Sequence, residues 1–538
     1  MPRDTRARYF PSMTEAVRDA YAHGEEDERL EPLVVVDLKG NPVGRFSEGD
    51  VVIFYDIRGE REIELSSALV DDDFEEFLVK KGLNLGLVTM IEYHKDLNVR
   101  VAFPPQGKIE DTLSHVLSRN KKTQVKIVES EKAVHLSYFF RGKSEEPIPG
   151  EERLIIPSFK IAKPELKPEM NIAEVTEAIL TKLADERIHM ITANLANVDV
   201  VGHTEDERAI LTSIEAVDAA LGRIIPKAES MKITTIVTAD HGTVESWLYP
   251  DGTIDTGHTR SAVPFIIVEP EDAIASNLRL REGGGLADVA PTVLHILGIE
   301  KPPIMTGSSL LLKSPYENNE RERLLLLILD GWGINDETQG NLIHKAATPV
   351  MDELLKIHPN TRLQASGEAV GMPKGSVGNS EVGHLHLGAG RIIPSDRMRI
   401  DSAIADDSFF KNPAFLAAMQ DVKTTGKNLH LLGIVSFYSS HGSVTHLKAL
   451  LELANKKDVK QVYVHGILGR RGEHAQSGAR YINDIEEFTK KLNLGNVVTV
   501  IGRHWALDRE HNWDRVKRTY DSLVFGSGKH VIIKTEDK

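Results

Sequence analysis

Short apolar runs rich in valine, isoleucine and leucine alternate along this chain with longer segments of mixed polarity. The runs have strand length, and their lack of polar alternation is typical of strands that are buried on both faces. The clearest runs are residues 188–195, 234–239, 324–329, 428–436, 461–468 and 496–502. Alternation of such strands with helical segments indicates an α/β fold with parallel sheets that helices cover on both faces.

Two helices are indicated outside these runs. Between the first two runs, apolar residues recur at intervals of four and three, which places them on one face of a helix. These residues are Ile210, Ile214, Val217, Leu221 and Ile224. A second helix is predicted to begin at Ser12, because Glu15 follows three residues later and completes a capping box.

The composition is that of a globular enzyme of several domains. The chain has 538 residues, which suggests roughly two to four domains, because single cores rarely exceed about 250 residues. The formal charge of −15 argues against broad nucleic-acid binding, which needs a positive surface. Cysteine is absent, so disulfides, thiolate catalysis and cysteine-ligated metal sites are excluded.

The N-terminal segment lacks an apolar core of signal-peptide length, and the longest aliphatic run, residues 324–329, is far shorter than a membrane span. We therefore expect a cytoplasmic protein without a membrane anchor.

Acidic and imidazole side chains follow several of the predicted strands. In open parallel sheets, ligands bind outside the carboxyl ends of the strands, so these positions are candidates for a metal site. Each alone is more often a turn former or a helix cap, but together they offer carboxylate and imidazole ligands without sulfur, which suit Mn²⁺ or Zn²⁺. The candidates are Asp199, His203, Asp240, His241, His258 and Asp330.

Ser380 is the candidate nucleophile. It lies in the segment G-N-S-E-V-G-H, residues 378–384, whose glycines allow a tight backbone path and a close approach by phosphate. The residues after it can open a helix whose N-terminal amides would stabilise an anion. The alternative is that Ser380 merely caps this helix; a neighbouring metal pair, which would activate the hydroxyl, favours catalysis.

Basic residues form a third group. Arg58 and Arg61 lie three residues apart, and Arg503 and Arg509 bracket a second segment, while Lys132 stands alone after Glu131. Arginine forks match the geometry of phosphate and carboxylate groups. Scattered arginines are usually solvated surface charges, so only the other candidates make a binding role for this group worth considering.

Four segments together resemble the cofactor-independent phosphoglycerate mutases, which are binuclear-metal members of the alkaline phosphatase superfamily. They are L-I-L-D-G-W-G at 327–333, G-N-S-E-V-G-H-L at 378–385, V-D-V-V-G-H-T at 198–204 and T-A-D-H-G at 238–242. The resemblance runs over roughly residues 12–525. It implies an alkaline-phosphatase-like parallel-sheet domain and a smaller α/β transferase domain.

The order of these segments departs from the family, in which D-G-W-G lies near the N-terminus and D-H-G comes late. The resemblance therefore implies a circular permutation. Residues 1–98 and 399–538 would form the transferase domain, and residues 99–311 and 324–398 the phosphatase-like domain. Residues 312–323 would connect the two ends of the family's usual order.

The resemblance also implies the residue roles. Asp199, His203 and His258 would hold one metal ion, and Asp330, Ser380, Asp240 and His241 the other. Ser380 and Lys132 would be catalytic, and His441, Arg471, Arg503, Arg509, Arg58, Arg61 and Lys132 would bind the substrate.

On the family's pattern, a monomer would interconvert 3-phosphoglycerate and 2-phosphoglycerate through phosphoserine. It would use two divalent ions, Mn²⁺ in the first place with Zn²⁺ or Co²⁺ as alternatives, and no bisphosphoglycerate. Its partner would be a small phosphorylated molecule, with neither nucleic acid nor membrane.

Two substrate motifs depart from the family. Residues 469–472 read G-R-R-G in place of D-G-R-D, and Phe437-Tyr438-Ser439 replaces D-G-G. The metal ligands and the nucleophile are all present, which indicates phosphoryl chemistry, whereas the departures concern the part that would hold the acceptor. The alternatives are a metal-dependent phosphohydrolase, a mutase for another phosphorylated metabolite, and a catalytically silent binding protein that keeps the fold.

Overall fold

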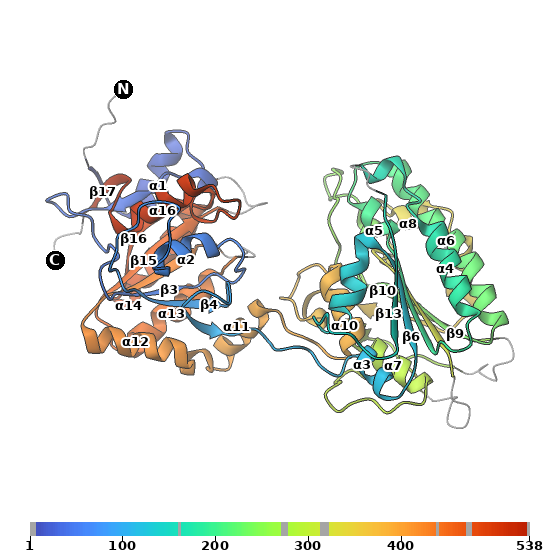
Figure 1. Cartoon of the computed structure of the whole chain (residues 1–538). Coiled ribbons are helices and arrows are strands. Elements are labelled where there is room, and N and C mark those ends of the chain that lie inside the picture. The colour runs from blue at the N-terminus through green and yellow to red at the C-terminus, as the bar shows by residue number, and fades with distance from the viewer. Residues whose placement is uncertain are drawn as a thin grey trace. The chain divides into compact units, whose positions relative to one another are not determined.

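The computed structural model describes residues 7–159, 163–270, 278–312, 322–436, 441–469 and 476–534. The chain divides into two compact units (Figure 1). Unit 1 comprises Met1–Pro105 and Arg399–Lys538, and unit 2 comprises Gln106–Met398. Both ends of the chain therefore lie in unit 1.

Unit 1 is built on a nine-stranded sheet with the order β1-β17-β2-β16-β15-β14-β3-β4-β5. All neighbours are parallel except β2 and β16, which are antiparallel. The strands are β1 (Arg8–Phe10), β2 (Leu33–Val35), β3 (Val51–Phe54), β4 (Gly86–Ile91), β5 (Arg100–Phe103), β14 (Leu429–Ile434), β15 (Val462–Leu468), β16 (Asn496–Gly502) and β17 (Lys529–Ile533).

The helices of unit 1 pack in a chain of contacts, α1 on α14 and α14 on α13, with α16 on α2. The predicted capping of the first helix is confirmed, because Ser12 is its N-cap and accepts a hydrogen bond from the amide of Glu15. The main helices are α1 (Met13–Ala22), α2 (Ile63–Val70), α12 (Pro413–Thr425), α13 (Val444–Lys456), α14 (Gly478–Leu492) and α16 (Trp513–Val524); α11 (Asp396–Ala405) crosses the division between the units.

Unit 2 is built on an eight-stranded sheet with the order β11-β13-β10-β9-β12-β8-β6-β7. Its central strands β9, β12, β8 and β6 are parallel and every residue in them is buried, as their apolar runs predict. The strands are β6 (Gln124–Glu129), β7 (Glu151–Ile156), β8 (Met190–Leu195), β9 (Thr234–Thr238), β10 (Val263–Val268), β11 (Gly284–Gly285), β12 (Leu324–Leu329) and β13 (Asn360–Gln364).

Helices cover both faces of this sheet, with α4 beside α6 on one face and α3, α7 and α10 on the other (Figure 1). The predicted amphipathic helix is confirmed as α6, which buries all five of its periodic apolar residues. The helices are α3 (Leu113–Arg119), α4 (Ile172–Leu183), α5 (Asn197–Gly202), α6 (Glu207–Ser230), α7 (Val289–Ile296), α8 (Leu342–Lys345), α9 (Pro349–Ile357) and α10 (Ser380–Ala389). No helix among the described residues is long and apolar enough to cross a membrane.

The prediction of parallel sheets holds for most strand pairs of unit 2 but not for β10, which runs antiparallel to both β9 and β13. Residues 239–262 join β9 to β10 with only one short 3-10 turn, η5 (Val244–Ser246), between them. Without a crossover helix to carry the chain back along the sheet, the next strand returns in the opposite direction. An apolar run predicts burial but not strand direction. Of the predicted connector at 312–323, residues 313–321 lie outside the described residues.

Candidate metal centre

The parallel strands β9, β12 and β8 deliver three carboxylates to one edge of the unit 2 sheet. Asp330 directly follows β12, Asp240 follows β9 after one alanine, and Asp199 lies in α5, which follows β8. The three strands are neighbours in the sheet, so their carboxyl ends meet. The structure thus brings together the candidates that the strand ends predict.

Lys132 lies at the middle of this cluster. It ends the short turn η2 (Ser130–Lys132) that follows β6. Its Nζ atom donates to Asp199 Oδ2 at 2.6 Å, to Asp330 Oδ1 at 2.7 Å and to Ser380 Oγ at 2.6 Å. Burial alone would lower the pKa of Lys132, but the surrounding carboxylates raise it above its usual value, with Asp330 contributing most.

The cluster has more buried negative charge than its one lysine can balance. Asp199, Asp240 and Asp330 are each no more than 4% exposed. Asp240 Oδ2 is buried and accepts no hydrogen bond, which is costly for a carboxylate oxygen. Burial would raise the pKa of Asp330, yet Lys132 and His241 hold it below its usual range. An excess of ionised carboxylate in a closed site fits bound cations.

Two histidines give an independent indication of a cation. His203 Nδ1 bonds the carbonyl of Thr256 at 2.8 Å, and His258 Nδ1 bonds the carbonyl of Gly378 at 3.0 Å. A carbonyl only accepts, so each Nδ1 carries a proton, and in the neutral imidazole that binds a metal ion each Nε2 carries the lone pair. The two Nε2 atoms lie 3.1 Å apart, and Asp199 Oδ1 lies 3.4 Å and 3.2 Å from them. Lone pairs converge in this way on a positive ion between them.

Among the described residues, two ligand groups lie at metal-binding spacing. One is Asp199, His241 and His258, and the other is Asp240, His241 and Asp330. His241 is completely buried between the two groups; its Nε2 atom is 3.5 Å from Asp199 and from Asp240. Burial would lower the pKa of His241, but these carboxylates raise it to about 10. Oxygen and nitrogen donors without sulfur suit borderline divalent ions.

Ser380 is the first residue of α10, and its hydroxyl faces the cluster. Its Oγ atom lies 3.0 Å from His241 Nε2 and 3.2 Å from Asp330 Oδ1. The capping alternative for Ser380 is wrong, because Asn379 is the N-cap and accepts from the amide of Val382. The serine hydroxyl is therefore available for chemistry at the positive end of the helix.

The glycines around Ser380 make room for neighbouring backbone atoms and not for a ligand. A Cβ atom at Gly378 would collide with the carbonyl of Ala365, and one at Gly383 would lie 2.6 Å from the carbonyl of Asp240. Gly383 therefore allows α10 to pack directly on the segment that carries Asp240. The sequence indicates a tight backbone path here, and this close packing is the reason for it.

Sequence reasoning missed two buried members of the centre, Asn194 and His384. Asn194 Nδ2 donates to Asp330 Oδ2 at 2.7 Å and lies 3.0 Å from His384 Nε2. His384 Nδ1 bonds the carbonyl of Ser380 at 2.9 Å. Asn194 carried a signal, because it is an amide in a buried strand whose only other polar residue is Thr192.

The predicted substrate residues of unit 1 lie after the carboxyl ends of β3, β14 and β16. Arg58 and Arg509 both pair with Glu60, at 2.9 Å and 2.8 Å, although they are far apart in sequence. Burial would raise the pKa of Glu60, but the two arginines lower it. Arg61 donates to the carbonyl of Leu507 at 3.1 Å. These arginines form a basic cluster.

His441 lies beside the buried Glu62, and Arg503 lies beside the exposed Glu28 of the same unit. His441 Nδ1 is 3.1 Å from Glu62 Oε1, and Arg503 Nε is 3.7 Å from Glu28 Oε1. Burial and the neighbouring Glu62 raise the pKa of Asp56 well above its usual range. Arg471, and the departures at 437–439 and 470–472, lie outside the described residues.

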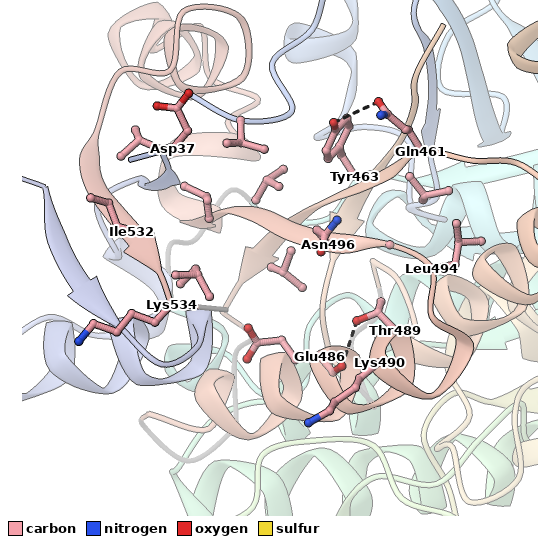
Figure 2. Close-up of a pocket in the computed structure, with 18 of the residues that line it drawn as sticks. Asp37, Gln461, Tyr463, Glu486, Thr489, Lys490, Leu494, Asn496, Ile532 and Lys534 are labelled. Atoms are coloured by element: carbon pink, nitrogen blue, oxygen red, sulfur yellow. Dashed lines mark hydrogen bonds between the residues drawn. The ribbon is translucent and has the colours of Figure 1, made fainter. Parts of the chain in front are cut away.

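A cavity of about 1120 Å³ in unit 1 is separate from these residues (Figure 2). Its lining includes Gln461, Tyr463 and Asn496, which lie at the amino-terminal ends of β15 and β16. Figure 2 shows Lys490 and Glu486 from α14 along its rim. No predicted site residue lines this cavity.

The two ligand groups and the serine beside them form a candidate metal centre in an α/β fold. Comparison with known families agrees. Residues 47–301 match the model of the Metalloenzyme superfamily, and residues 400–537 match that of the BPG-independent PGAM N-terminus.

The curated relatives of the chain share one name. The 2,3-bisphosphoglycerate-independent phosphoglycerate mutases of Pseudomonas fluorescens, Thermomicrobium roseum and Moorella thermoacetica are 41%, 42% and 42% identical to this chain over 298, 304 and 303 residues. These matches cover 55–56% of this chain and 56–58% of the relatives, so the chain spans only a little over half of their length. Over the matched part, the chain is therefore similar to 2,3-bisphosphoglycerate-independent phosphoglycerate mutases.

Among solved structures, a Leishmania mexicana phosphoglycerate mutase, crystallised at low cobalt concentration, aligns with a TM-score of 0.37 at 29% identity. This alignment covers 57% of this chain and 59% of that one, and at this TM-score it supports no conclusion about the fold.

Proposed function

We propose that this protein interconverts 3-phosphoglycerate and 2-phosphoglycerate without bisphosphoglycerate, through a phosphoserine at Ser380. The observation that carries the proposal is the contact of Lys132 Nζ with both Ser380 Oγ and two carboxylates of the metal centre. A nucleophile, a positive charge and metal ligands thus share one buried site, as phosphoryl transfer requires. The relatives at about 40% identity support the choice of substrate.

In this proposal Asp199, His203 and His258 hold one divalent ion, and Asp240, His241, Asp330 and Ser380 the other. Mn²⁺ is the first choice, with Zn²⁺ or Co²⁺ as alternatives. When bound, the ions activate the serine hydroxyl and neutralise charge on the phosphoryl group. The convergence of His203 Nε2 and His258 Nε2 and the buried Asp240 Oδ2, which accepts no hydrogen bond, support two ion positions.

The chain's own residues then perform the transfer in two steps. Ser380 loses its hydroxyl proton and its Oγ forms a bond to phosphorus, while the bond from phosphorus to the C3 oxygen breaks and that oxygen takes up a proton. The C2 hydroxyl of the same glycerate then loses its proton and attacks phosphorus, while the bond from phosphorus to Ser380 Oγ breaks and the serine hydroxyl is protonated again. Lys132, held by Asp199 and Asp330, donates hydrogen bonds to the phosphoryl oxygens in both steps.

We propose in addition that the residues of unit 1 bind the carboxylate and hydroxyl groups of the substrate. The basic cluster of Arg58, Arg61 and Arg509, together with His441, Arg471 and Arg503, would supply the donors. Arg58 and Arg509 are already placed together by Glu60, which supports a shared role. The enzyme would act as a monomer in the cytoplasm on small phosphorylated molecules.

The segment order supports a circular permutation, which we also propose. The family model described as an N-terminus matches residues 400–537, the C-terminal part of this chain. The three relatives each match one block of about 300 residues, near the length expected for one of two exchanged blocks. The parallel pairing of β1 with β17 places the first and last described strands side by side.

A phosphohydrolase is the second candidate, because the G-R-R-G sequence at 469–472 lacks an acidic residue of the family's substrate motif. One assay separates the two functions. The purified protein is given 3-phosphoglycerate and Mn²⁺ without bisphosphoglycerate, and both 2-phosphoglycerate and free phosphate are measured. The mutase produces 2-phosphoglycerate; free phosphate alone would replace the mutase by the hydrolase. Ser380→Ala is the control and should be inactive in both measurements.

A further inference from the structure

A hydrogen-bonded chain inside unit 2 connects a metal-binding carboxylate to the backbone of the nucleophile. We propose that Asn194 and His384 are a positioning pair, which orients Asp330 and Ser380 without touching the substrate. Asn194 is 1% exposed, and His384 is completely buried. The inference rests on the proposed function only where it concerns turnover, since its metal-binding part stands on the structure alone.

Asn194 binds one oxygen of Asp330 and thereby fixes the direction of the other. Its Nδ2 group donates to Asp330 Oδ2 at 2.7 Å. Asp330 Oδ1 is thereby directed to the reacting side, where it meets Lys132 Nζ at 2.7 Å and Ser380 Oγ at 3.2 Å. Without Asn194, the carboxylate would be free to rotate and to present either oxygen. Outer contacts of this kind commonly govern how a ligand presents itself to a metal ion.

His384 determines which way the amide of Asn194 points. Its Nδ1 atom lies 2.9 Å from the carbonyl of Ser380 and 3.2 Å from Asp240 Oδ2, and both are acceptors. The proton is therefore on Nδ1, and Nε2 accepts from Asn194 Nδ2 at 3.0 Å. If the amide of Asn194 were flipped, its oxygen would face the Asp330 carboxylate and the lone pair of His384 Nε2, and both contacts would be repulsive. Both Nδ2 protons are thus used, and one orientation remains.

The sheet register explains why this residue must be polar. Asn194 in β8 is paired with Ile328 in β12, two residues before Asp330. The neighbouring strand positions are apolar, as a doubly covered strand requires. A buried amide in such a strand lowers stability unless its hydrogen bonds are made. Asn194 makes two of them to groups of the metal centre, and that is the role we assign to it.

Helix α10 offers a matched control two residues further on. His386 is also completely buried, and its Nδ1 bonds the carbonyl four residues earlier, that of Val382. Its Nε2 accepts from the amide of Ile393 at 3.0 Å. His386 therefore copies the local geometry of His384 but lacks the contact with Asn194. Substitutions at the two histidines separate positioning from simple helix stability.

The test measures Mn²⁺ binding by calorimetry and then turnover at saturating Mn²⁺. We expect Asn194→Leu to weaken Mn²⁺ binding by about 10- to 100-fold. At saturating metal, kcat should still fall while KM for 3-phosphoglycerate stays within about twofold. His384→Gln keeps an acceptor near the Nε2 position and should retain Mn²⁺ affinity. His384→Asn loses that acceptor and should resemble Asn194→Leu, whereas His386→Asn should bind Mn²⁺ like the parent.

The outcomes are distinct. The inference is overturned if Asn194→Leu and His384→Asn bind Mn²⁺ within twofold of the parent, or if His386→Asn weakens binding as much as His384→Asn. Far-ultraviolet circular dichroism and melting of the metal-free proteins exclude variants that fail to fold; a second variant, Asn194→Ser, then replaces Asn194→Leu. If the parent binds Mn²⁺ but forms no 2-phosphoglycerate, the proposed function fails while the binding test still decides the inference.

Discussion

The ammonium nitrogen of Lys132 lies 2.6 Å from the hydroxyl oxygen of Ser380, although 248 residues separate them in the chain. The same nitrogen bridges two of the three buried carboxylates. Lys132 thus places a buried positive charge directly beside Ser380.

Lys132→Gln should lower kcat by about 10²- to 10³-fold, the usual effect of removing a donor that stabilises developing charge. Metal affinity should be retained or increased, because removal of a positive charge leaves the carboxylates to attract Mn²⁺ more strongly. Steady-state kinetics and calorimetry on one preparation test both expectations. Loss of Mn²⁺ binding together with activity would show that Lys132 has a structural role instead. Lys108→Gln, which removes an exposed partner of Glu146, is the control.

Ser380→Ala should remove turnover, since the step that Ser380 performs has no substitute among its neighbours. Intact-mass spectrometry of the parent, quenched during turnover, should show a phosphorylated form that the variant lacks. Peptide mapping should place the phosphate within residues 378–384. Phosphate on another residue, or full activity of Ser380→Ala, would contradict the phosphoserine mechanism. Because Asn379 supplies the helix cap, the melting temperature should change little.

Asp240→Asn should have opposite effects on the two metal states of the protein. Without metal, it removes one of three close negative charges, so the melting temperature of the chelated protein should rise. With Mn²⁺, it removes a ligand, so affinity should fall at least tenfold and metal should stabilise the protein less. Thermal melting with and without chelator tests both directions. Asp336→Asn, an exposed partner of Arg362, should change neither.

Much of this centre could be predicted from the sequence, because apolar runs show where the strands end. Apolar runs predict where β8, β9 and β12 end, and parallel neighbours bring Asp199, Asp240 and Asp330 together. Asn194 and His384 were not predicted, because their role depends on the hydrogen bonds that each makes in three dimensions. The reversed direction of β10 was likewise hidden, since burial gives the same apolar pattern for either direction.

Unit 1 should lose stability in acid because of two buried histidines. His430 Nε2 bonds Asp50, and His430 Nδ1 lies 3.0 Å from His465 Nε2. Burial lowers the pKa of both histidines, and Arg45 lowers it further. The unfolded chain takes up protons as the pH falls through about 6.5, whereas the two folded histidines take them up only at lower pH. The free energy of unfolding is therefore unaffected above that pH and falls below it, by up to about 1.4 kcal/mol per pH unit for each histidine.

His465→Gln should reduce this slope by up to about 1.4 kcal/mol per pH unit, which is the contribution of one proton. His23→Gln, at an exposed position, should leave the slope unchanged. Hydrogen exchange of the β14 and β15 amides between about pH 5 and pH 8 measures the slope. An equal slope in parent and His465→Gln would show that His465 does not bind a proton on unfolding in this range.

The proposed permutation predicts that the chain can be reopened and rejoined without loss of fold. β1 and β17 are parallel neighbours, with Arg8 beside Val531 and Phe10 beside Ile533. A chain that passes from the end of β17 to the start of β1 must run back along about three residues, or roughly 10 Å. Residues 535–538 and 1–6 provide ten residues, which can extend to about 33 Å. The rejoined segment is therefore long enough.

The rearranged protein would begin at Glu322, end at Leu312 and join Lys538 directly to Met1. Both new ends lie beside well-anchored residues, since Leu312 donates to the carbonyl of Arg279 and Arg323 donates to that of Ile188. Leu312 and Glu322 are both exposed, and exposed positions are where permutation is usually tolerated. We expect circular dichroism, Mn²⁺ affinity and kcat to stay within about twofold of the parent. A rearranged chain that folds but neither binds Mn²⁺ nor turns over substrate would contradict the permutation, because the two orders would then not be equivalent ways of building the same enzyme.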